Sequence, residues 1–203
     1  MARLAPIAPL KLAFLVEGDA EKAFLEALVP RVLGPRVALR VVRIGMKSAF
    51  SSTYFDAFRL LEAGYAAVFL LVNANTEIVD EIDRQRQELV EVFRRYGLAG
   101  YVQVHVVVPM LEAWLLAAYQ AHPEQSTRPR RDLACHAGPD AESRIQELAA
   151  GLPLELARRR SRSLRKFLTA LEALASEKAP ARRRAARLRA ALVGIEPAER
   201  AVL

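Results

Sequence analysis

The chain has 203 residues, of which 53% are hydrophobic and 26% are charged, so it can bury a core of normal size and is not disordered by composition. Its single cysteine, Cys135, excludes a disulfide framework and a cysteine-rich zinc site. No apolar run reaches the ~18 residues that a membrane-spanning helix needs, and the first residues do not form a signal-peptide pattern. We therefore expect a cytoplasmic protein with no membrane association.

The net charge of +7 is unevenly distributed along the chain. Residues 158–203 hold 13 Lys and Arg against 4 Asp and Glu, a surplus of +9, whereas residues 1–157 hold 17 against 19, a balance of −2. A basic C-terminal end indicates a polyanionic partner such as nucleic acid. A pair of arginine-rich helices that merely face solvent would give the same count, so both interpretations stay open.

Four short apolar runs predict buried strands, and amphipathic segments between them predict helices. Three runs are nearly continuous in Val, Leu, Ile and Phe, which is typical of parallel strands covered on both faces. The second run alternates arginine with apolar residues, so we expect it nearer an edge of the sheet. The predicted strands are 11–16, 37–44, 66–72 and 102–108, and the predicted helices are 20–33, 53–63, 77–96 and 110–119.

This alternation predicts an α/β fold: a parallel four-stranded sheet flanked by helices, with right-handed crossovers and a C-terminal helical extension. We expect residues 10–121 to form the α/β domain, and residues 122–203 to form a loop and a basic helical extension packed on it. Residues 122–140 predict a long loop because they are rich in Pro, Arg, Gly and Ser. Helical patterns follow near 141–150, 154–175 and 181–193, and Pro30 is expected to kink or end the first helix.

Polar side chains follow the strands, at the edge where open α/β sheets bind ligands. Carboxylate oxygens suit Mg²⁺, two such ions can clamp a phosphoryl transfer, and a lysine can hold a phosphate. Taken singly, Glu21 could serve only the helix dipole. Glu112, however, lies in an apolar stretch, where a carboxylate costs free energy unless it faces a site or a partner. The candidates are Glu17, Glu21, Lys47, Asn73, Asn75 and Glu112.

Three segments together resemble a Toprim-type domain: LVEGDAEKAFLEAL (15–28), AAVFLLVNANTE (66–77) and VVVPMLEAWLLA (106–117). More closely, residues 10–175 resemble small Toprim-like bacterial proteins of unknown function related to the nuclease domain of the OLD (overcoming lysogenization defect) family. Their Gly-Lys-Ser element corresponds to residues 45–48 with one residue inserted. Their Glu-Ala-Trp helix corresponds to residues 112–114, and their Ser-x-Ser-Phe-like segment to residues 161–167.

The resemblance implies a Rossmann-like Toprim fold with a Mg²⁺- or Mn²⁺-dependent phosphoryl-transfer site that acts on nucleic acid. Glu17 would be a metal ligand or general acid/base, Glu21 and Glu112 would complete the acidic set, and Lys47 would assist catalysis. A phage-defence or toxin role, and a partner ATPase or a homo-oligomer, would suit the family. Basic residues that would contact nucleic-acid phosphates are Arg158, Arg159, Arg160, Arg162, Arg165 and Lys166, with further arginines at 182–189.

The chain departs from the Toprim pattern at the Asp-x-Asp motif, where it has Asn73-Ala74-Asn75. In the family pattern these positions are the main metal ligands, and an amide oxygen is a weaker ligand for Mg²⁺ than a carboxylate. We expect weaker metal binding and a loss on the order of 10²–10⁴ in rate. These two residues are also the only asparagines in the chain.

Three explanations for the two asparagines stay open. The chain could be a non-catalytic module that has decayed naturally, an engineered form that silences a toxic nuclease, or a protein with an ordinary turn that asparagine suits. The sequence therefore supports two functions. One is a Toprim-like metal-dependent nuclease, impaired at this motif, and the other is a nucleic-acid-binding or assembly protein that kept the fold without catalysis.

Overall fold

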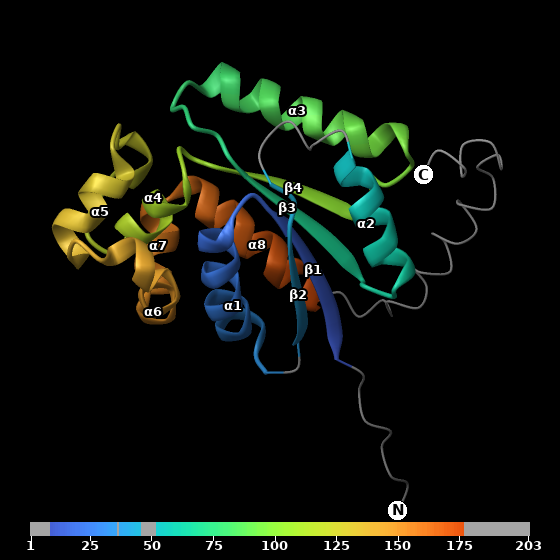
Figure 1. Cartoon of the computed structure of the whole chain (residues 1–203), viewed down its shortest axis with the longest axis horizontal. Helices are drawn as coiled ribbons and strands as arrows, with labels where there is room; N and C mark the ends of the chain where they lie inside the picture. The colour runs from blue at the N-terminus through green and yellow to red at the C-terminus, as the bar shows by residue number, and fades with distance from the viewer. Residues whose placement is uncertain (1–8, 36, 46–51, 177–203) are drawn as a thin grey trace, which may run out of the picture.

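The computed structural model describes residues 9–35, 37–45 and 52–176. These residues form a four-stranded parallel sheet with helices on both faces (Figure 1). The strands are β1 (Leu10–Val16), β2 (Val37–Arg43), β3 (Ala67–Asn73) and β4 (Val102–Val107), in the order β2-β1-β3-β4. The predicted α/β fold class is confirmed, and β2 lies at an edge as expected. The other edge strand is β4.

Alternating side chains of the strands form two apolar clusters, one on each face of the sheet. On one face, Phe14 and Phe69 stack with ring centroids 4.9 Å apart, under α1 (Asp19–Leu33) and α8 (Arg162–Ser176). On the other face, α2 (Thr53–Glu62) and α3 (Val79–Arg95) cover the cluster that contains Leu15 and Leu70. Figure 1 shows these two helix layers on either side of the sheet. Because β1 and β3 are buried on both faces, their sequences are apolar without alternation.

The predicted loop at 122–140 is wrong, because it contains η2 (Pro123–Gln125) and α5 (Pro129–Ala137). Proline is well tolerated in the first turn of a helix, and Gly138, with φ 100°, follows the last turn. Residues that suggest a loop by composition here mark the two ends of a helix. η3 (Ala141–Arg144) and α6 (Ile145–Gly151) follow, and α6 packs on α1.

The predicted helix at 154–175 is two helices, α7 (Leu154–Arg160) and α8, separated at Ser161. Leu133, Ile145 and Leu164 belong to the same apolar cluster as Phe14, so the helices after α4 (Leu111–Leu116) extend the core of the sheet. The predicted helix at 181–193 lies outside the described residues. No helix in the described ranges is long and apolar enough to span a membrane.

Two details of the predicted helices are corrected. Pro30 does not end the first helix, because α1 continues to Leu33 and finishes at Gly34, whose N–H donates to the Pro30 carbonyl. The predicted helix at 77–96 includes Ile78, but α3 begins at Val79 and the Ile78 side chain is exposed. It precedes the first turn of α3 with an extended backbone, so helical periodicity does not apply to it.

Candidate functional site

Asn73, at the carboxyl end of β3, joins three other elements through hydrogen bonds. Its backbone N–H donates to Oε2 of Glu17 at 2.6 Å, and its Nδ2 donates to Oε1 of Glu21 at 2.7 Å. Its Oδ1 accepts a hydrogen bond from the Leu111 N–H at 3.0 Å. Glu17 follows β1, Glu21 lies in α1 and Leu111 begins α4. A single asparagine therefore holds two carboxylates and the start of a helix in one place.

The parallel sheet explains why Asn73 reaches these partners. Residue 73 directs its N–H toward β1, while the next N–H, of Ala74, donates to the Val107 carbonyl on the other side. The Asn75 N–H continues outward to the Pro109 carbonyl at 2.7 Å. The Gln85 side chain of α3 donates to the Asn73 carbonyl at 3.2 Å. The end of β3 is thus fixed by its neighbours on both sides and by α3.

Glu21 is buried and lies against the backbone of Gly18. A Cβ atom at position 18 would lie 3.1 Å from Oε2 of Glu21, so glycine gives this carboxylate its room. A neighbouring acid, Asp19, turns instead to the surface, where it pairs with Arg43 at 2.5 Å. Of the first-turn acids of α1, Glu21 alone points into the cluster.

Glu112 is buried in the first turn of α4, with 4% of its surface exposed. Burial raises the pKa of its carboxyl, and the negative charge of Glu21 adds to the rise, while a backbone hydrogen bond and Arg130 lower it. The Arg130 Nε of α5 donates to Oε1 of Glu112 at 3.0 Å. Glu112 therefore lies close enough to Glu21 to feel its charge, but its hydrogen-bond partner is an arginine.

The structure unites some of the predicted site residues and separates others. Glu17, Glu21 and Asn73 form one hydrogen-bonded cluster, which we call the strand-end cluster, and Glu112 lies beside it. Asn75 is exposed with φ 57°, a left-handed conformation that asparagine tolerates well. Within the described ranges, no hydrogen bond joins the Asn75 side chain to the cluster. Lys47 lies outside the described residues.

The donor atoms of the strand-end cluster decide whether it suits a divalent cation. The Asn73 amide presents N–H to Glu21, in the place where a cation would otherwise balance that carboxylate, and Arg130 balances Glu112. Among the described residues, no group of three or more His, Cys, Asp or Glu could hold a metal ion. Asn73 directs its amide nitrogen to Glu21 and its amide oxygen to the Leu111 N–H, an orientation that suits hydrogen bonding within the protein better than ligation of a cation.

The predicted nucleic-acid-binding residues divide into two groups. Arg158 pairs with Glu172 and so joins α7 to α8, whereas Arg160 donates to the carbonyls of Ala117 and Ala118 at 3.2 Å and joins α7 to the end of α4. The remaining four are exposed: Arg159, Arg162, Arg165 and Lys166. Charge composition alone does not distinguish an arginine used in an internal contact from one that faces solvent.

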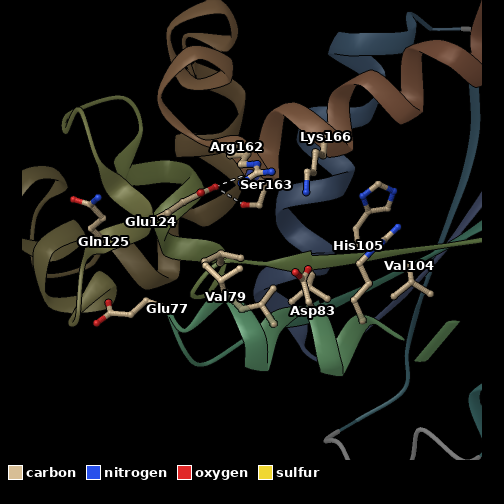
Figure 2. A pocket seen from close by; sticks show the side chains of 14 residues that line it. Glu77, Val79, Asp83, Val104, His105, Glu124, Gln125, Arg162, Ser163 and Lys166 are labelled. Carbon is tan, nitrogen blue, oxygen red and sulfur yellow. Dashed lines mark hydrogen bonds between the residues drawn. The ribbon is translucent and has the colours of Figure 1, made fainter. Parts of the chain in front are cut away.

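Sequence reasoning missed a groove of about 730 Å³ along β4, between α3 and α8. In Figure 2, Arg162 and Lys166 lie on one side of the strand, and Val79 and Asp83 on the other. At one end, Oε1 of Glu124 accepts hydrogen bonds from the Ser161 hydroxyl at 2.7 Å and from the Ser163 N–H and hydroxyl at 2.6 Å. The Ser-x-Ser pattern signals a helix start, but its distant acidic partner has no sequence signal.

Comparison with known proteins adds no assignment: no family model matches the chain, and no curated protein or solved structure matches it significantly.

Proposed function

We propose that the protein is a Toprim-like nucleic-acid-binding protein whose strand-end cluster is a silenced divalent-metal phosphoryl-transfer site. The observation that carries this proposal is the convergence of Glu17, Glu21 and Asn73 at the carboxyl ends of neighbouring parallel strands, with Glu112 beside them. This is the sheet edge at which open α/β folds bind ligands. Three buried or half-buried acids at one such edge would be costly without a charge-balancing role.

Asn73 donates a hydrogen bond to each of two carboxylates in the cluster. Oε1 of Glu21 lies 2.7 Å from the Asn73 amide nitrogen, and an aspartate there would bring two carboxylates into contact. Like charges at such a distance require a bound cation or a proton to coexist. The asparagine removes one negative charge and donates a hydrogen bond, so it stabilises the carboxylates while it weakens any metal site.

The nucleic-acid partner follows from the charge that remains exposed. Arg159, Arg162, Arg165 and Lys166 are available on the surface of α7 and α8, and the sequence beyond residue 176 adds further arginines. Phosphate contacts of this kind supply affinity without sequence preference and weaken steeply as salt rises. We therefore expect binding to a fluorescent oligonucleotide to fall sharply with ionic strength, and a flat salt dependence would contradict this part of the proposal.

Restoring aspartate tests the silenced site directly. The double variant N73D/N75D should gain Mn²⁺- or Mg²⁺-dependent cleavage of DNA or RNA, with a rate at least on the order of 10² above the present chain. Calorimetric titration should show that the double variant binds Mn²⁺ more tightly. The matched control N73D/N75D/E17Q keeps a side-chain oxygen at position 17 that can accept from the backbone N–H of residue 73, but it lacks the negative charge of Glu17. This control should lose the gained activity. Absence of cleavage with every common divalent ion would count against the proposal.

A second candidate function is a binding or assembly protein without catalytic ancestry. The specific observation in its favour is that Asn73 uses both its amide donor and its amide acceptor in hydrogen bonds within the protein, which an aspartate could not do. This candidate predicts that N73D/N75D only loses stability, and that nucleic-acid binding is the same with and without a chelator. The cleavage assay and the Mn²⁺ titration separate the two candidates.

A further inference from the structure

In the part of the chain that the structure describes, backbone groups on the outer side of β4 have no hydrogen-bond partner. The Val68 N–H donates to the Tyr101 carbonyl and the Ala74 N–H to the Val107 carbonyl, so the odd-numbered residues of β4 direct their backbone groups toward β3. In a parallel pair the direction alternates residue by residue. Val104 and Val106 therefore point their N–H and C=O groups away from the sheet. Within the described part of the chain, no strand or side chain hydrogen-bonds to them.

Two pockets lie next to each other along this edge of β4. The groove of about 730 Å³ reaches from Val104 to Val108, and a second hollow of about 280 Å³ reaches from Val102 to His105. Both are lined by Arg86, Val104 and His105. A strand of seven residues is about 23 Å long, so the two hollows form a track whose shape suits an extended chain.

The two walls of the track differ in chemistry. The α8 wall carries Arg162 and Lys166, and the nearby Glu124 is already bound by the serines at the start of α8. The α3 wall carries the apolar Val79 and Ile82, with the charged side chains of Glu77, Asp83 and Arg86 beside them. Val79 is 63% exposed, so its apolar side chain is available to a ligand in the groove. A ligand in the track would therefore meet two cations on the α8 side, and apolar side chains together with charges of both signs on the α3 side.

The spacing of the two cations also suits a strand. Arg162 and Lys166 are one helical turn apart, which places them about 6 Å from each other along α8. Residues i and i+2 of an extended chain point to the same side and are about 6.6 Å apart. Two acidic residues at alternate positions of a bound strand would thus lie opposite the two cations.

We propose that the free edge of β4 takes up an extended protein segment as a fifth strand, with acidic side chains toward α8 and apolar side chains toward α3. A second copy of the chain fits less well, because antiparallel pairing of two β4 strands would bring the two α8 walls and their cations together. Nucleic acid that contacts Arg162 and Lys166 from the outer surface of α8 fits less well inside the track, because Glu77 and Asp83 on the α3 side would repel phosphates. The proposal does not depend on the strand-end cluster.

A blocked seven-residue peptide that alternates valine and glutamate is the probe, with a valine–lysine peptide as its charge control. On binding, amide hydrogen exchange at Val104 and Val106 should slow at least about tenfold. Exchange at Gln103 and His105, which already pair with β3, should stay the same. Since only one edge of the peptide can face β4, N-methylation of one alternating set of its amides should weaken binding about tenfold or more. N-methylation of the other set should not.

Charge reversal provides the second arm. R162E/K166E should weaken binding of the glutamate peptide about tenfold and strengthen binding of the lysine peptide. The matched control R159E/R165E changes two exposed arginines that do not line the track, and it should leave both affinities unchanged. Any of four results would overturn the proposal: no peptide binding at about 1 mM, binding without protection of Val104 and Val106, equal affinity of both N-methylated peptides, or protection of these amides by an oligonucleotide alone.

Discussion

At the carboxyl end of β3, polar groups of the protein bind one another through hydrogen bonds. Along the outer side of β4, by contrast, backbone polar groups of the strand face an open groove. Asn73 uses its donors and its acceptor within the protein, and Arg130 covers Glu112. Val104 and Val106 point backbone groups outward, and Lys166 lines the same groove. The comparison shows that acids at the usual ligand-binding edge of a sheet can be bound by groups of the same protein, while backbone groups at the edge of the sheet face a groove.

Among the substitutions considered, N73D in the strand-end cluster should have the largest effect. It replaces the donor to Glu21 with a second carboxylate, so we expect a loss of about 2–4 kcal/mol in the free energy of unfolding. In a chain of this length that corresponds to a fall of roughly 5–15 °C in Tm. Thermal unfolding with a chelator measures the loss, and added Mn²⁺ should restore part of it through binding to the folded state.

Asn75 offers the matched control for that measurement. It is exposed, and aspartate tolerates its left-handed backbone, so N75D should change the free energy of unfolding by less than about 0.5 kcal/mol. Equal losses in N73D and N75D would show that the strand-end cluster does not depend on the Asn73 amide.

His105 lines the groove along β4, and its titration should make the stability of the protein depend on pH. Burial, followed by the charges of Arg86 and Lys166, lowers its pKa from 6.5 to about 4. Its contribution to stability is therefore complete above pH 6.5 and is lost as the pH falls toward 4, because the unfolded chain takes up the proton first. The variant H105F keeps a ring against Phe69 and Phe167 and removes this titration.

Urea unfolding above pH 6.5 and near pH 4 measures the effect. The acid-induced loss in the free energy of unfolding should be smaller in H105F than in the unaltered chain, by on the order of 2–3 kcal/mol. The control H122F removes an exposed histidine and should leave the loss as it was. An unchanged pH dependence in H105F would mean that solvent reaches His105 freely through the track.

Sequence patterns predicted the sheet well because burial on both faces leaves a direct trace in composition. The ends of the predicted strands lie within one residue of the ends of β1 to β4, since continuous apolar runs stop where the chain leaves the sheet. The segment 122–140 failed for the opposite reason. Its nine-residue helix α5 buries few side chains, among them Leu133, so its apolar pattern is faint and its proline and glycine dominate.

The candidate site could be predicted only as far as strand order allows. The carboxyl ends of parallel strands meet at one edge, so the meeting of Glu17 with Asn73 follows from topology. The hydrogen bond from Leu111 to Asn73 depends on the register between β3 and β4, and the partner of Glu112 depends on α5. Neither has a local sequence signal, and neither does the free edge of β4, which exists because no described strand follows it in the sheet.

Glu124 lines one end of the groove and also binds the start of α8, so its substitution tests whether this end of the groove contributes to stability. Its Oε1 accepts three hydrogen bonds at the start of α8, so E124A should cost about 1–2 kcal/mol in the free energy of unfolding. Thermal unfolding measures the change. The control E77A removes an exposed acid from the other side of the groove and should cost less than about 0.5 kcal/mol. Equal losses in E124A and E77A would show that the hydrogen bonds of Glu124 to the start of α8 do not stabilise the fold.

The smallest effect is expected at Asp19, which shares the first turn of α1 with Glu21 but lies outside the strand-end cluster. Its ion pair with Arg43 joins side chains that are 57% and 77% exposed, so solvent screens most of the attraction. We expect D19N to lower the free energy of unfolding by less than about 0.5 kcal/mol, and this difference should vanish in high salt. Chemical unfolding at two salt concentrations checks both points. A loss as large as that of N73D, unaffected by salt, would mean that Asp19 acts on the cluster through the backbone of Gly18, and that the cluster extends further along α1 than its hydrogen bonds indicate.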